Sequence, residues 1–454
     1  MKPVVIIGAV AAGMSAASEL KRRMPDLQVV VYGREPYISY GACGMPYLLS
    51  GEVKGPERLQ VLSVQDAREK RGIDLYTEHE VTALDPKKKT ITVHNLVSGQ
   101  RHDTEYEKLV LATGARAFKP PMKGLDLPGV FTLKEFQDGL DVQRFMLGKK
   151  PSRAVILGGG YIGIETAEAF RQRGMEVTVV EALPRILTLL DEDFSALLEE
   201  ELARQNVKLL TGKKVTSFFG SGKLEGVELE DGTRLEADIA LVSAGVLPNS
   251  GLAEEAGLNL GEKKAVLVDR FLKTSDPDIY AAGDCATVYH RGLDRDVFIP
   301  LALGANRQGR MCGENIAAEL MGEEPKAFPG ILGTAVSRVF DLEFSKTGIG
   351  SVEVERYGLD TIDVAAVKAK NLAGYFTGTT PMHLKLYYDR DTGVVKGGQI
   401  VGGHPSAKRI DTIAVAVAAG MTLEEVYSLD LAYAPPFSPV WDPMLLAARS
   451  GMKK

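Results

Sequence analysis

Cysteine is scarce in this sequence, because only Cys43, Cys285 and Cys312 occur among its 454 residues. Three cysteines far apart in the chain exclude a disulfide framework, and the lack of a C-x2-C pair gives no reason to expect a bound metal. The chain also lacks an excess of basic residues, with a formal net charge of -6, and it has no apolar run of the roughly 18 residues that a membrane span needs. We therefore expect a cytoplasmic protein that binds neither nucleic acid nor membrane.

The remaining composition is that of an ordinary globular protein. Hydrophobic residues make up 45% of the chain and charged residues 25%, which is typical of a chain with a packed core. A length of 454 residues predicts several domains.

The first motif opens the chain, where an apolar run, a glycine-rich turn and a helical stretch follow one another. Val4 to Ile7 leads into Gly8-Ala9-Val10-Ala11-Ala12-Gly13, and then come a predicted helix from Met14 to Met24 and a second strand from Gln28 to Tyr32. This order is typical of a βαβ dinucleotide-binding unit, in which the helix start offers free N–H groups to a pyrophosphate.

Two positions of this unit depart from the usual pattern. Val10 stands where the middle glycine of G-x-G-x-x-G is expected, and Gly33 stands where an acidic residue usually binds the ribose. Arg34 and Glu35 follow directly, so the sequence leaves open which of them contacts the ribose.

The second motif has the full glycine spacing. A strand from Arg153 to Leu157 precedes Gly158-Gly159-Gly160-Tyr161-Ile162-Gly163, a helix is predicted from Ile164 to Arg173, and the next strand ends at Glu181. An acidic side chain at that point accepts hydrogen bonds from ribose hydroxyls and repels a 2′-phosphate. We therefore expect NADH rather than NADPH, although Arg185 nearby leaves NADPH open.

A third segment identifies the family. Residues 278–285 predict a strand that ends in Gly283-Asp284, and a helix follows from Leu301 to Leu320. Together with the two glycine motifs, this set resembles the FAD-dependent pyridine nucleotide-disulfide oxidoreductases. Residues 109–115 resemble the family's crossover strand out of the flavin domain, and residues 241–248 resemble the return. The resemblance extends over essentially the whole chain.

The resemblance implies the fold and its division into domains. We expect an α/β fold with two Rossmann-like dinucleotide-binding domains, as in glutathione reductase, and an α+β C-terminal dimerisation domain. The expected FAD-binding domain covers 1–115 and 243–328, the NAD(P)H-binding domain covers 116–242, and the dimerisation domain covers 329–454.

The same resemblance assigns cofactor contacts position by position. The implied FAD contacts are Gly8, Ala11, Ala12, Gly13, Arg34, Glu35, Val81, Ala112, Thr113, Gly114, Gly283 and Asp284. The implied NAD contacts are Gly158, Gly160, Tyr161, Ile162, Gly163, Glu181 and Gly245.

Cys43 carries the catalytic hypothesis. Many members of the family have a C-x4-C pair in this region, but the position that would hold the second cysteine is Leu48. A single thiol beside a flavin forms a mixed disulfide with a substrate or cycles through a sulfenic acid. We expect the flavin and surrounding N–H groups to lower the pKa of this thiol.

Two branches of the family use a single cysteine, and the sequence distinguishes them. The peroxide- and oxygen-reducing branch places a histidine in the first glycine loop, where this chain has Ala11 and Ala12. Residues 8–13 and 39–47 instead resemble the coenzyme A disulfide reductases and coenzyme A persulfide reductases. They depart from that pattern at Ala9 and Ala42, where glycine and asparagine are usual.

Further residues are implied only by this second resemblance. In that branch a tyrosine from the partner subunit of a homodimer reaches the active site, and Tyr433 fits that role, with Tyr375 as a second candidate. The implied coenzyme A contacts are Ser15, Arg22, Ser39, Ala42, Arg71 and Asn306.

These observations predict an enzyme that passes electrons from NAD(P)H through FAD and Cys43 to a coenzyme A disulfide, persulfide or polysulfide. An NADH oxidase or peroxidase that works through a Cys43 sulfenate is the main alternative. A flavin-bound redox sensor that acts through a partner is the non-enzymatic alternative.

Overall fold

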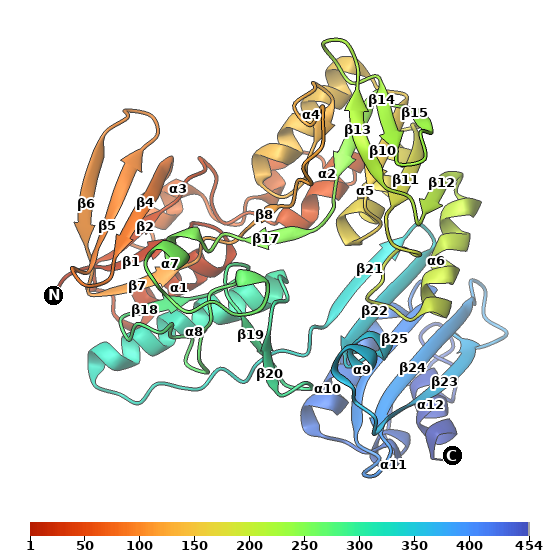
Figure 1. Cartoon of the computed structure of the whole chain (residues 1–454). Helices are drawn as coiled ribbons and strands as arrows, with labels where there is room; N and C mark the ends of the chain where they lie inside the picture. Colours follow the sequence, from red (N-terminus) through yellow and green to blue (C-terminus); the bar gives the residue numbers. More distant parts are fainter. Residues whose placement is uncertain (453–454) are drawn as a thin grey trace.

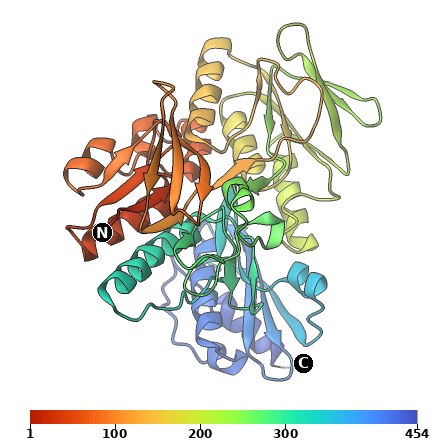
Figure 2. The ribbon, with the colours of Figure 1, turned by 60° about the vertical axis from the view of Figure 1, so that its left-hand side comes forward.

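Three five-stranded sheets organise the computed structural model of the chain, which describes residues 1–452 (Figure 1). Each sheet is the centre of one lobe, and Figure 2 shows the lobes meeting around a common centre. Along the chain they are called the first, second and third lobe. Within the described residues, no helix combines the length and apolar character required to cross a membrane.

The first lobe contains a parallel sheet in the order β18-β7-β1-β2-β3. Its central strands are short runs rich in β-branched residues and are buried, as expected for a parallel sheet covered on both faces. Helices α1 and α8 pack closely because Gly309 allows it: a Cβ there would lie 2.1 Å from the Ala12 carbonyl oxygen. The elements are β1 (Val4–Ile7), α1 (Ala11–Arg23), β2 (Val29–Tyr32), η1 (Ala42–Gly44), α2 (Met45–Ser50), η2 (Pro56–Leu59), α3 (Val64–Glu69), β3 (Asp74–Tyr76), β4 (His79–Asp85), β5 (Thr90–Asn95), β6 (Arg101–Glu105), β7 (Lys108–Leu111), α7 (Gly251–Glu255), η3 (Glu262–Lys264), β18 (Ile279–Ala281), β19 (Val288–His290), β20 (Arg295–Val297) and α8 (Ala302–Met321).

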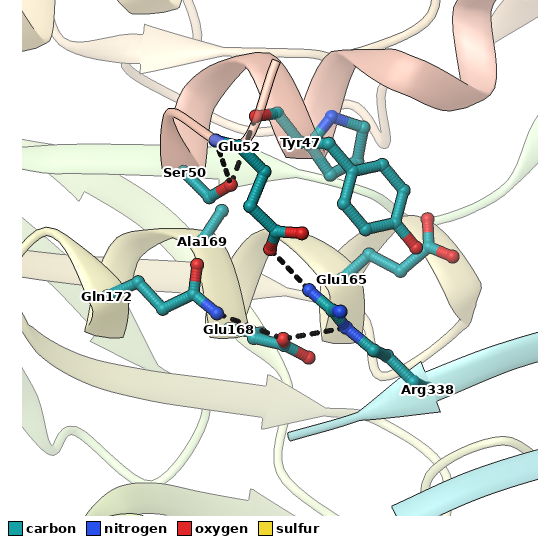
Figure 3. Close-up of a pocket in the computed structure, with 9 residues that line it drawn as sticks. Tyr47, Ser50, Glu52, Glu165, Glu168, Ala169, Gln172 and Arg338 are labelled. Atoms are coloured by element: carbon teal, nitrogen blue, oxygen red, sulfur yellow. Dashed lines mark hydrogen bonds and ion pairs between the residues drawn. The ribbon is translucent and has the colours of Figure 1, made fainter. Parts of the chain in front are cut away.

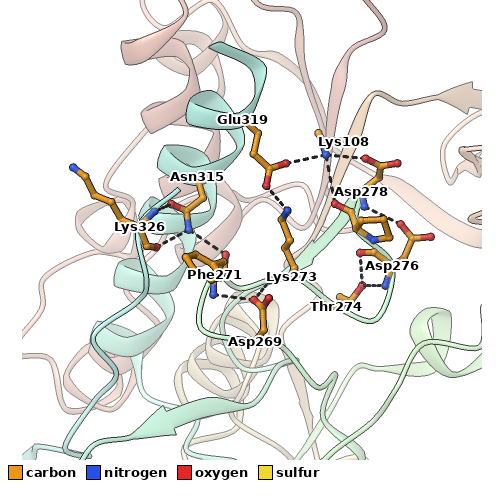
Figure 4. Close-up of polar contacts among 11 residues, drawn as sticks. Lys108, Asp269, Phe271, Lys273, Thr274, Asp276, Asp278, Asn315, Glu319 and Lys326 are labelled. Carbon is orange, nitrogen blue, oxygen red and sulfur yellow. Dashed lines mark hydrogen bonds and ion pairs between the residues drawn. The ribbon is translucent and has the colours of Figure 1, made fainter. Parts of the chain in front are cut away.

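A network of ion pairs ties α8 to the edge of this sheet (Figure 4). Lys108, at the start of β7, donates to Asp278 at 2.7 Å and to Glu319 of α8 at 2.9 Å. Its side chain is 13% exposed, so the pairs are largely shielded from solvent. Asp278 and Glu319 each have a second lysine partner, Lys89 and Lys273. The network therefore joins β7 and the residue before β18 to α8, the last helix of the first lobe.

The second lobe repeats the arrangement with a parallel sheet in the order β12-β11-β10-β16-β9. Strands β8 and β17 form an antiparallel ribbon between the first and second lobes. The elements are β8 (Ala115–Ala117), β9 (Val130–Phe131), α4 (Phe136–Lys149), β10 (Arg153–Leu157), α5 (Tyr161–Gln172), β11 (Glu176–Glu181), α6 (Glu192–Arg204), β12 (Val207–Thr211), β13 (Val215–Phe219), β14 (Gly226–Leu229), β15 (Arg234–Glu236), β16 (Ile239–Val242) and β17 (Val246–Pro248).

The third lobe is an antiparallel sheet in the order β21-β22-β25-β24-β23, with α10, α11 and α12 packed on it. The elements are β21 (Ala335–Val339), β22 (Leu342–Gly348), α9 (Ser351–Tyr357), β23 (Ile362–Lys370), β24 (Pro381–Asp389), β25 (Val395–Gly403), η4 (Ala407–Arg409), α10 (Ile410–Ala419), α11 (Leu423–Tyr427) and α12 (Pro443–Gly451). The predicted α/β fold with two dinucleotide-binding units and an α+β C-terminal part is confirmed. The three domain boundaries remain predictions.

The two predicted nucleotide-binding helices begin earlier than their sequences indicated. α1 starts at Ala11 and α5 at Tyr161, each three residues before the expected start. Each helix begins within its glycine motif, so the turn itself is shorter than the motif. The residue that directly precedes the helix is the one at the middle glycine position, Val10 in the first motif and Gly160 in the second.

Candidate active site

Cys43 lies where the first lobe meets the second. It is the middle residue of the 3-10 turn η1, directly before α2. The buried side chains Met45, Leu48 and Leu49 fix α2 in the core of the second lobe, against α4 and α5. Cys43 itself is exposed, whereas Cys285 and Cys312 are fully buried. Among the described residues, Cys43 is therefore the one thiol that a soluble reactant can reach.

The protein groups around Cys43 act against the lowering of its pKa that we expect from a bound flavin. They raise the pKa, first by partial burial of the thiol and then by the negative charge of Glu165. The positive charge of Lys134 acts in the opposite direction and does not outweigh them. Neither residue lies near Cys43 in sequence, and the lowering expected from a bound flavin stays a prediction.

The Glu165 carboxylate belongs to a polar cluster in which all three lobes meet (Figure 3). Arg338 of β21 donates to Glu168 of α5 at 3.0 Å and also pairs with Glu52, which follows α2. The neighbouring Ser337 hydroxyl donates to Glu165 at 2.5 Å.

Burial raises the pKa of both Glu165 and Glu168. Burial, followed by the charge of Glu165, raises the pKa of Tyr47 to about 12.

The first glycine turn needs its glycines for close packing. Gly8 has a φ of +117°, and a Cβ there would lie 2.0 Å from the Ala112 carbonyl oxygen. A Cβ on Gly13 would lie 1.8 Å from the carbonyl oxygen of Gly8. Val10, in the position of the missing middle glycine, packs against the core of the second lobe. No side chain caps α1 at Val10, and its first turn has no acidic residue, so its first N–H groups are available to a ligand.

Other predicted FAD residues gather around this turn. Gly283, with a φ of +81°, would place a Cβ 3.0 Å from the Ala12 Cβ. The next residue, Asp284, forms an ion pair with Lys134 at 2.8 Å. Thr113 and Gly114 follow β7, and the Thr113 hydroxyl donates to the Asn249 carbonyl at 2.6 Å. The structure thus brings together predicted residues that lie far apart in the sequence.

Arg34 and Glu35 make contacts with the protein instead of standing free at the end of β2. Arg34 pairs with Glu135 at the start of α4. The Tyr40 hydroxyl donates to Glu35, at 3.1 and 3.2 Å from its two carboxylate oxygens. Burial and then the charge of Glu135 raise the pKa of Glu35 to about 7. Neither contact decides which residue meets a ribose, so both assignments remain predictions.

Val81, another predicted FAD contact, is buried in β4.

The second glycine turn has one open glycine between two packed ones. A Cβ on Gly158 would lie 2.4 Å from the Ser243 carbonyl oxygen, and one on Gly163 would lie 2.0 Å from the carbonyl oxygen of Gly158. At Gly160, nothing lies within 4 Å of the corresponding position. Glu181 accepts hydrogen bonds from the N–H groups of Gly159 at 2.6 Å and Leu183 at 2.8 Å. These two hydrogen bonds hold the Glu181 carboxylate beside the second glycine turn.

Three other predicted NAD contacts are Tyr161, Ile162 and Gly245. The Tyr161 ring stacks on Phe344 of the third lobe with 5.4 Å between ring centroids, and its hydroxyl is buried without a hydrogen-bond partner among the described residues. Ile162 is half-buried in the first turn of α5. Gly245 has a φ of +105°, and its carbonyl accepts from the Phe118 N–H at 2.8 Å.

Comparisons with known proteins agree with this geometry. The family model described as pyridine nucleotide-disulphide oxidoreductase matches residues 2–309, and the dimerisation domain of the same family matches residues 334–444. The chain belongs to this family. It is therefore an oxidoreductase, and FAD and NAD(P)H are the cofactors that the family implies.

Individual relatives cover nearly the whole chain. An "NAD(P)H sulfur oxidoreductase (CoA-dependent)" of Pyrococcus furiosus is 38% identical over 449 residues, 99% of this chain and 98% of the relative. An "NADH oxidase" of Methanocaldococcus jannaschii is 34% identical over 451 residues, with coverage of 99% and 98%. The crystal structure of reduced CoADR-RHD from Bacillus anthracis matches with a TM-score of 0.95 and 33% identity, covering 100% of this chain and 80% of that one.

Four of the residues predicted to bind coenzyme A lie on α1 or contact it. Ser15 of α1 donates to the Asn306 side chain of α8 at 2.9 Å. Arg71 donates to the Ser18 hydroxyl of α1 at 2.5 Å. Ser15, Ser18 and Arg22 share one helix face, since they are three and four residues apart. Arg22 is paired with Glu19 of the same helix.

Two more of these residues frame Cys43. Ala42 is the first residue of η1, directly before the thiol. Ser39 adopts a φ of +44°, and its N–H donates to the Ala9 carbonyl at 2.9 Å. This bond connects the cysteine segment to the first glycine turn.

The two predicted catalytic tyrosines lie side by side on the surface of the third lobe. The hydroxyls of Tyr375 and Tyr433 are 3.4 Å apart. The two side chains are 78% and 46% exposed, and Phe437 and Trp441 beside Tyr433 in sequence are exposed too. An exposed apolar surface of this kind is typical of a contact site.

Three residues near the site were missed by the sequence reasoning. Lys134 lies in a loop, where no local pattern points to a function. Glu165 stands in a helix that is otherwise mostly buried, and a carboxylate in such a helix is a signal that could have been used. Ser18 lies on the same face of α1 as Ser15, and this spacing of three residues could have predicted its place near the site.

Proposed function

We propose that this chain is an FAD-dependent NAD(P)H reductase whose substrate is a coenzyme A disulfide or a coenzyme A persulfide or polysulfide. One observation carries the proposal: Cys43 is exposed between the two dinucleotide-binding lobes, while Cys285 and Cys312 are fully buried. No second protein thiol among the described residues is accessible, so the partner sulfur must come from the substrate. The names of the similar proteins from Pyrococcus and Bacillus support a sulfur substrate linked to coenzyme A.

The residues present fit both cofactors. Gly8 and Gly13 leave no room for a Cβ, so α1 approaches β1 closely and its uncapped N-terminus faces the turn that would hold the FAD pyrophosphate. Gly160 leaves an open position at the start of α5, as a bound NAD(P)H pyrophosphate requires. A bound FAD would supply the two-electron transfer chemistry between NAD(P)H and the sulfur of Cys43. Glu181 favours NADH, with Arg185 as the cation nearest in sequence for a 2′-phosphate.

Cys43 carries the substrate chemistry. Its thiolate attacks one sulfur of the substrate, a Cys43–substrate disulfide forms, and the other half leaves as a thiolate or as sulfide. Two electrons then cleave this mixed disulfide and return Cys43 as a thiolate with release of the second thiol. Because the protein raises the pKa of Cys43, we infer that the bound oxidised cofactor or the substrate would have to favour the thiolate.

The dimer completes the site in this proposal. The family's dimerisation model matches residues 334–444, which supports a homodimer. Tyr433 and Tyr375, close together on an exposed surface of the third lobe, would reach the partner's Cys43 and donate a proton to the leaving thiolate. Arg22 and Arg71 would bind phosphates of coenzyme A, because their planar groups match two phosphate oxygens.

The central test is Cys43→Ser, with Cys312→Ser as the matched control at a buried thiol. We expect Cys43→Ser to keep its FAD and its reduction by NADH but to lose turnover with coenzyme A disulfide and coenzyme A persulfide. Cys312→Ser should keep turnover. Near-normal turnover in Cys43→Ser would refute the assignment.

An NADH oxidase or peroxidase that works through a Cys43 sulfenate is the second candidate, because the relative from Methanocaldococcus carries the name "NADH oxidase". The first glycine loop has Ala11 and Ala12 where the oxygen-reducing branch has a histidine, and this favours the sulfur substrate. Oxygen consumption measured with and without coenzyme A disulfide separates the two. An oxidase would consume oxygen at a rate that the disulfide does not change.

A further inference from the structure

Asp191 is a buried carboxylate that connects the second lobe to the third. It precedes α6 and is 8% exposed. An aspartate at the position before a helix usually accepts a hydrogen bond from the helix's own first N–H groups. Asp191 does not cap α6. Its side chain instead faces the third lobe.

Four side chains of the third lobe donate to this one carboxylate. Ser351 donates at 2.6 Å, Lys385 at 2.7 Å and Gln399 at 2.8 Å, and the Tyr387 hydroxyl donates as well. The Gln399 side chain also accepts from the Asp191 backbone N–H at 2.9 Å. Gln399 is 0% exposed and Tyr387 is 3% exposed.

The carboxylate is held in its charged form. Burial works to raise the pKa of Asp191, but the hydrogen bonds from Lys385, Ser351 and Tyr387 outweigh it, and the pKa is lowered. Hydrogen bonds to an ionised group are stronger than those between neutral groups. Removal of the charge would leave several donors buried without an adequate acceptor.

The ten residues before Asp191 form one wall of the second glycine turn. Glu181, at the end of β11, accepts from the Gly159 N–H at 2.6 Å, and the Leu187 N–H donates to the Gly159 carbonyl at 2.9 Å. Ile186 packs so tightly here that a Cβ on Gly159 would lie 2.5 Å from its Cγ2. Both peptide groups of Gly159 are thus fixed by the segment 181–187.

The third lobe holds the far end of the same segment. The Lys346 ammonium of β22 donates to the Leu189 carbonyl at 3.2 Å, and Lys346 is itself paired with Glu353 at 2.6 Å. Two residues later, Asp191 receives its four donors. Residues 182–190 are therefore fastened at one end to the glycine turn and at the other to the sheet of the third lobe.

We propose that Asp191 is a positioning residue for NAD(P)H: through it, the third lobe holds residues 182–190, and with them the second glycine turn, in the conformation that binds the dinucleotide. This inference rests on the proposed nicotinamide nucleotide site at Gly158 to Gly163. It assigns the dimerisation domain a part in nucleotide affinity, in addition to any role in dimer formation. A segment fixed before the ligand arrives loses less entropy on binding.

The test compares Asp191→Asn and Gln399→Leu with Asp193→Asn in the FAD-loaded protein. Asp193 is the matched control, because it lies two residues further along, pairs with the same Lys385 at 2.6 Å and is 62% exposed. Anaerobic reduction of the bound FAD is followed against NADH concentration, which gives a dissociation constant and a limiting rate. Calorimetric titration with NAD+ measures binding without turnover.

We expect Asp191→Asn and Gln399→Leu to weaken binding of NADH and NAD+ about tenfold or more, as loss of a buried hydrogen bond to a charged group would. The limiting rate and the FAD content should stay within about twofold, and Asp193→Asn should bind as the unmodified protein does. Tyr387→Phe removes one donor and should weaken binding less, which provides a milder variant if Asp191→Asn does not fold.

Unchanged NADH and NAD+ affinity in Asp191→Asn and Gln399→Leu, with only a lower melting temperature, would overturn the proposal and leave Asp191 a purely structural contact. A lower limiting rate at unchanged affinity would overturn it too. Failure of the unmodified protein to bind NADH would instead refute the nicotinamide site itself, so the two failures are distinguishable.

Discussion

Arg338→Met perturbs the polar cluster in which the three lobes meet (Figure 3). Arg338 pairs with Glu168, whose side chain is 7% exposed, and with Glu52, which is 44% exposed. Loss of one partner from a fully buried ion pair costs about 3 to 5 kcal/mol, whereas an exposed pair contributes about 0 to 1 kcal/mol. Arg338 is 37% exposed, so an intermediate value applies.

Two remaining contacts reduce the loss. Without Arg338, Glu168 still accepts from the Phe340 N–H at 2.9 Å and from Gln172 at 3.1 Å. We therefore expect Arg338→Met to lower the free energy of unfolding by about 2 kcal/mol near neutral pH. Arg144→Met is the control, because Arg144 is 75% exposed and, within residues 1–452, pairs only with an exposed carboxylate of its own helix. It should cost less than about 0.5 kcal/mol.

The loss should depend on pH. Burial raises the pKa of Glu168 above its ordinary value of 4.5, and Arg338 opposes that rise. Without Arg338, the folded state holds a proton on Glu168 over a wider pH range in which the unfolded chain has released it. Folding then takes up a proton, so the stability of the variant increases as pH falls towards 4.5. Arg338→Met should therefore cost less at pH 5.5 than at pH 8.

Urea unfolding of the FAD-loaded protein at both pH values measures these differences. Trp441 is the single tryptophan of the chain and lies in the third lobe, so its fluorescence reports that lobe, while flavin fluorescence reports the first. Equal losses in Arg338→Met and Arg144→Met would refute this reasoning. A loss in Arg338→Met that does not change with pH would refute the assignment of the proton to Glu168.

Three further predictions follow from the same contacts. Alkylation of Cys43 by iodoacetamide should show a lower apparent pKa in Glu165→Gln and a higher one in Lys134→Met, because the two charges act on the thiol with opposite signs; shifts in the same direction would contradict this. Lys108→Met (Figure 4) should lower the free energy of unfolding by about 2 kcal/mol in urea titrations, since both carboxylates keep a second lysine. Glu35→Gln should flatten the fall in stability between pH 4.5 and 7, because the folded pKa of Glu35 is about 7 and folding takes up a proton there.

The features that the sequence predicted correctly are local in the chain. Both glycine turns follow a buried strand and precede a helix, and the first and last glycines of each turn have the close packing that their spacing implies. The nine-residue motif around Cys43 is local too, and the catalytic role that it predicts for this exposed thiol stays a prediction. A pattern of neighbouring residues determines backbone geometry, and backbone geometry is what these motifs require.

The features that were missed depend on residues far apart in sequence. Lys134 meets Asp284 across 150 positions, and Ser337 meets Glu165 across 172. The protein raises the pKa of Cys43 first by burial of the thiol and then through Glu165, whose charge reaches the thiol from a distant segment. Local periodicity contains no information on such contacts.

The helix N-termini show where a local sequence rule predicts the side-chain cap and where it fails. α11 and α12 are capped by their own side chains, Thr422 and Asp442. α1 and α5 follow glycine turns without a side-chain cap and without an acidic residue in the first turn, so their N–H groups suit an anionic ligand. α6 has an aspartate in the capping position, and its sequence alone would predict an ordinary cap. The fold instead turns Asp191 to the third lobe, so a local rule fails where contacts between lobes determine the side chain's partner.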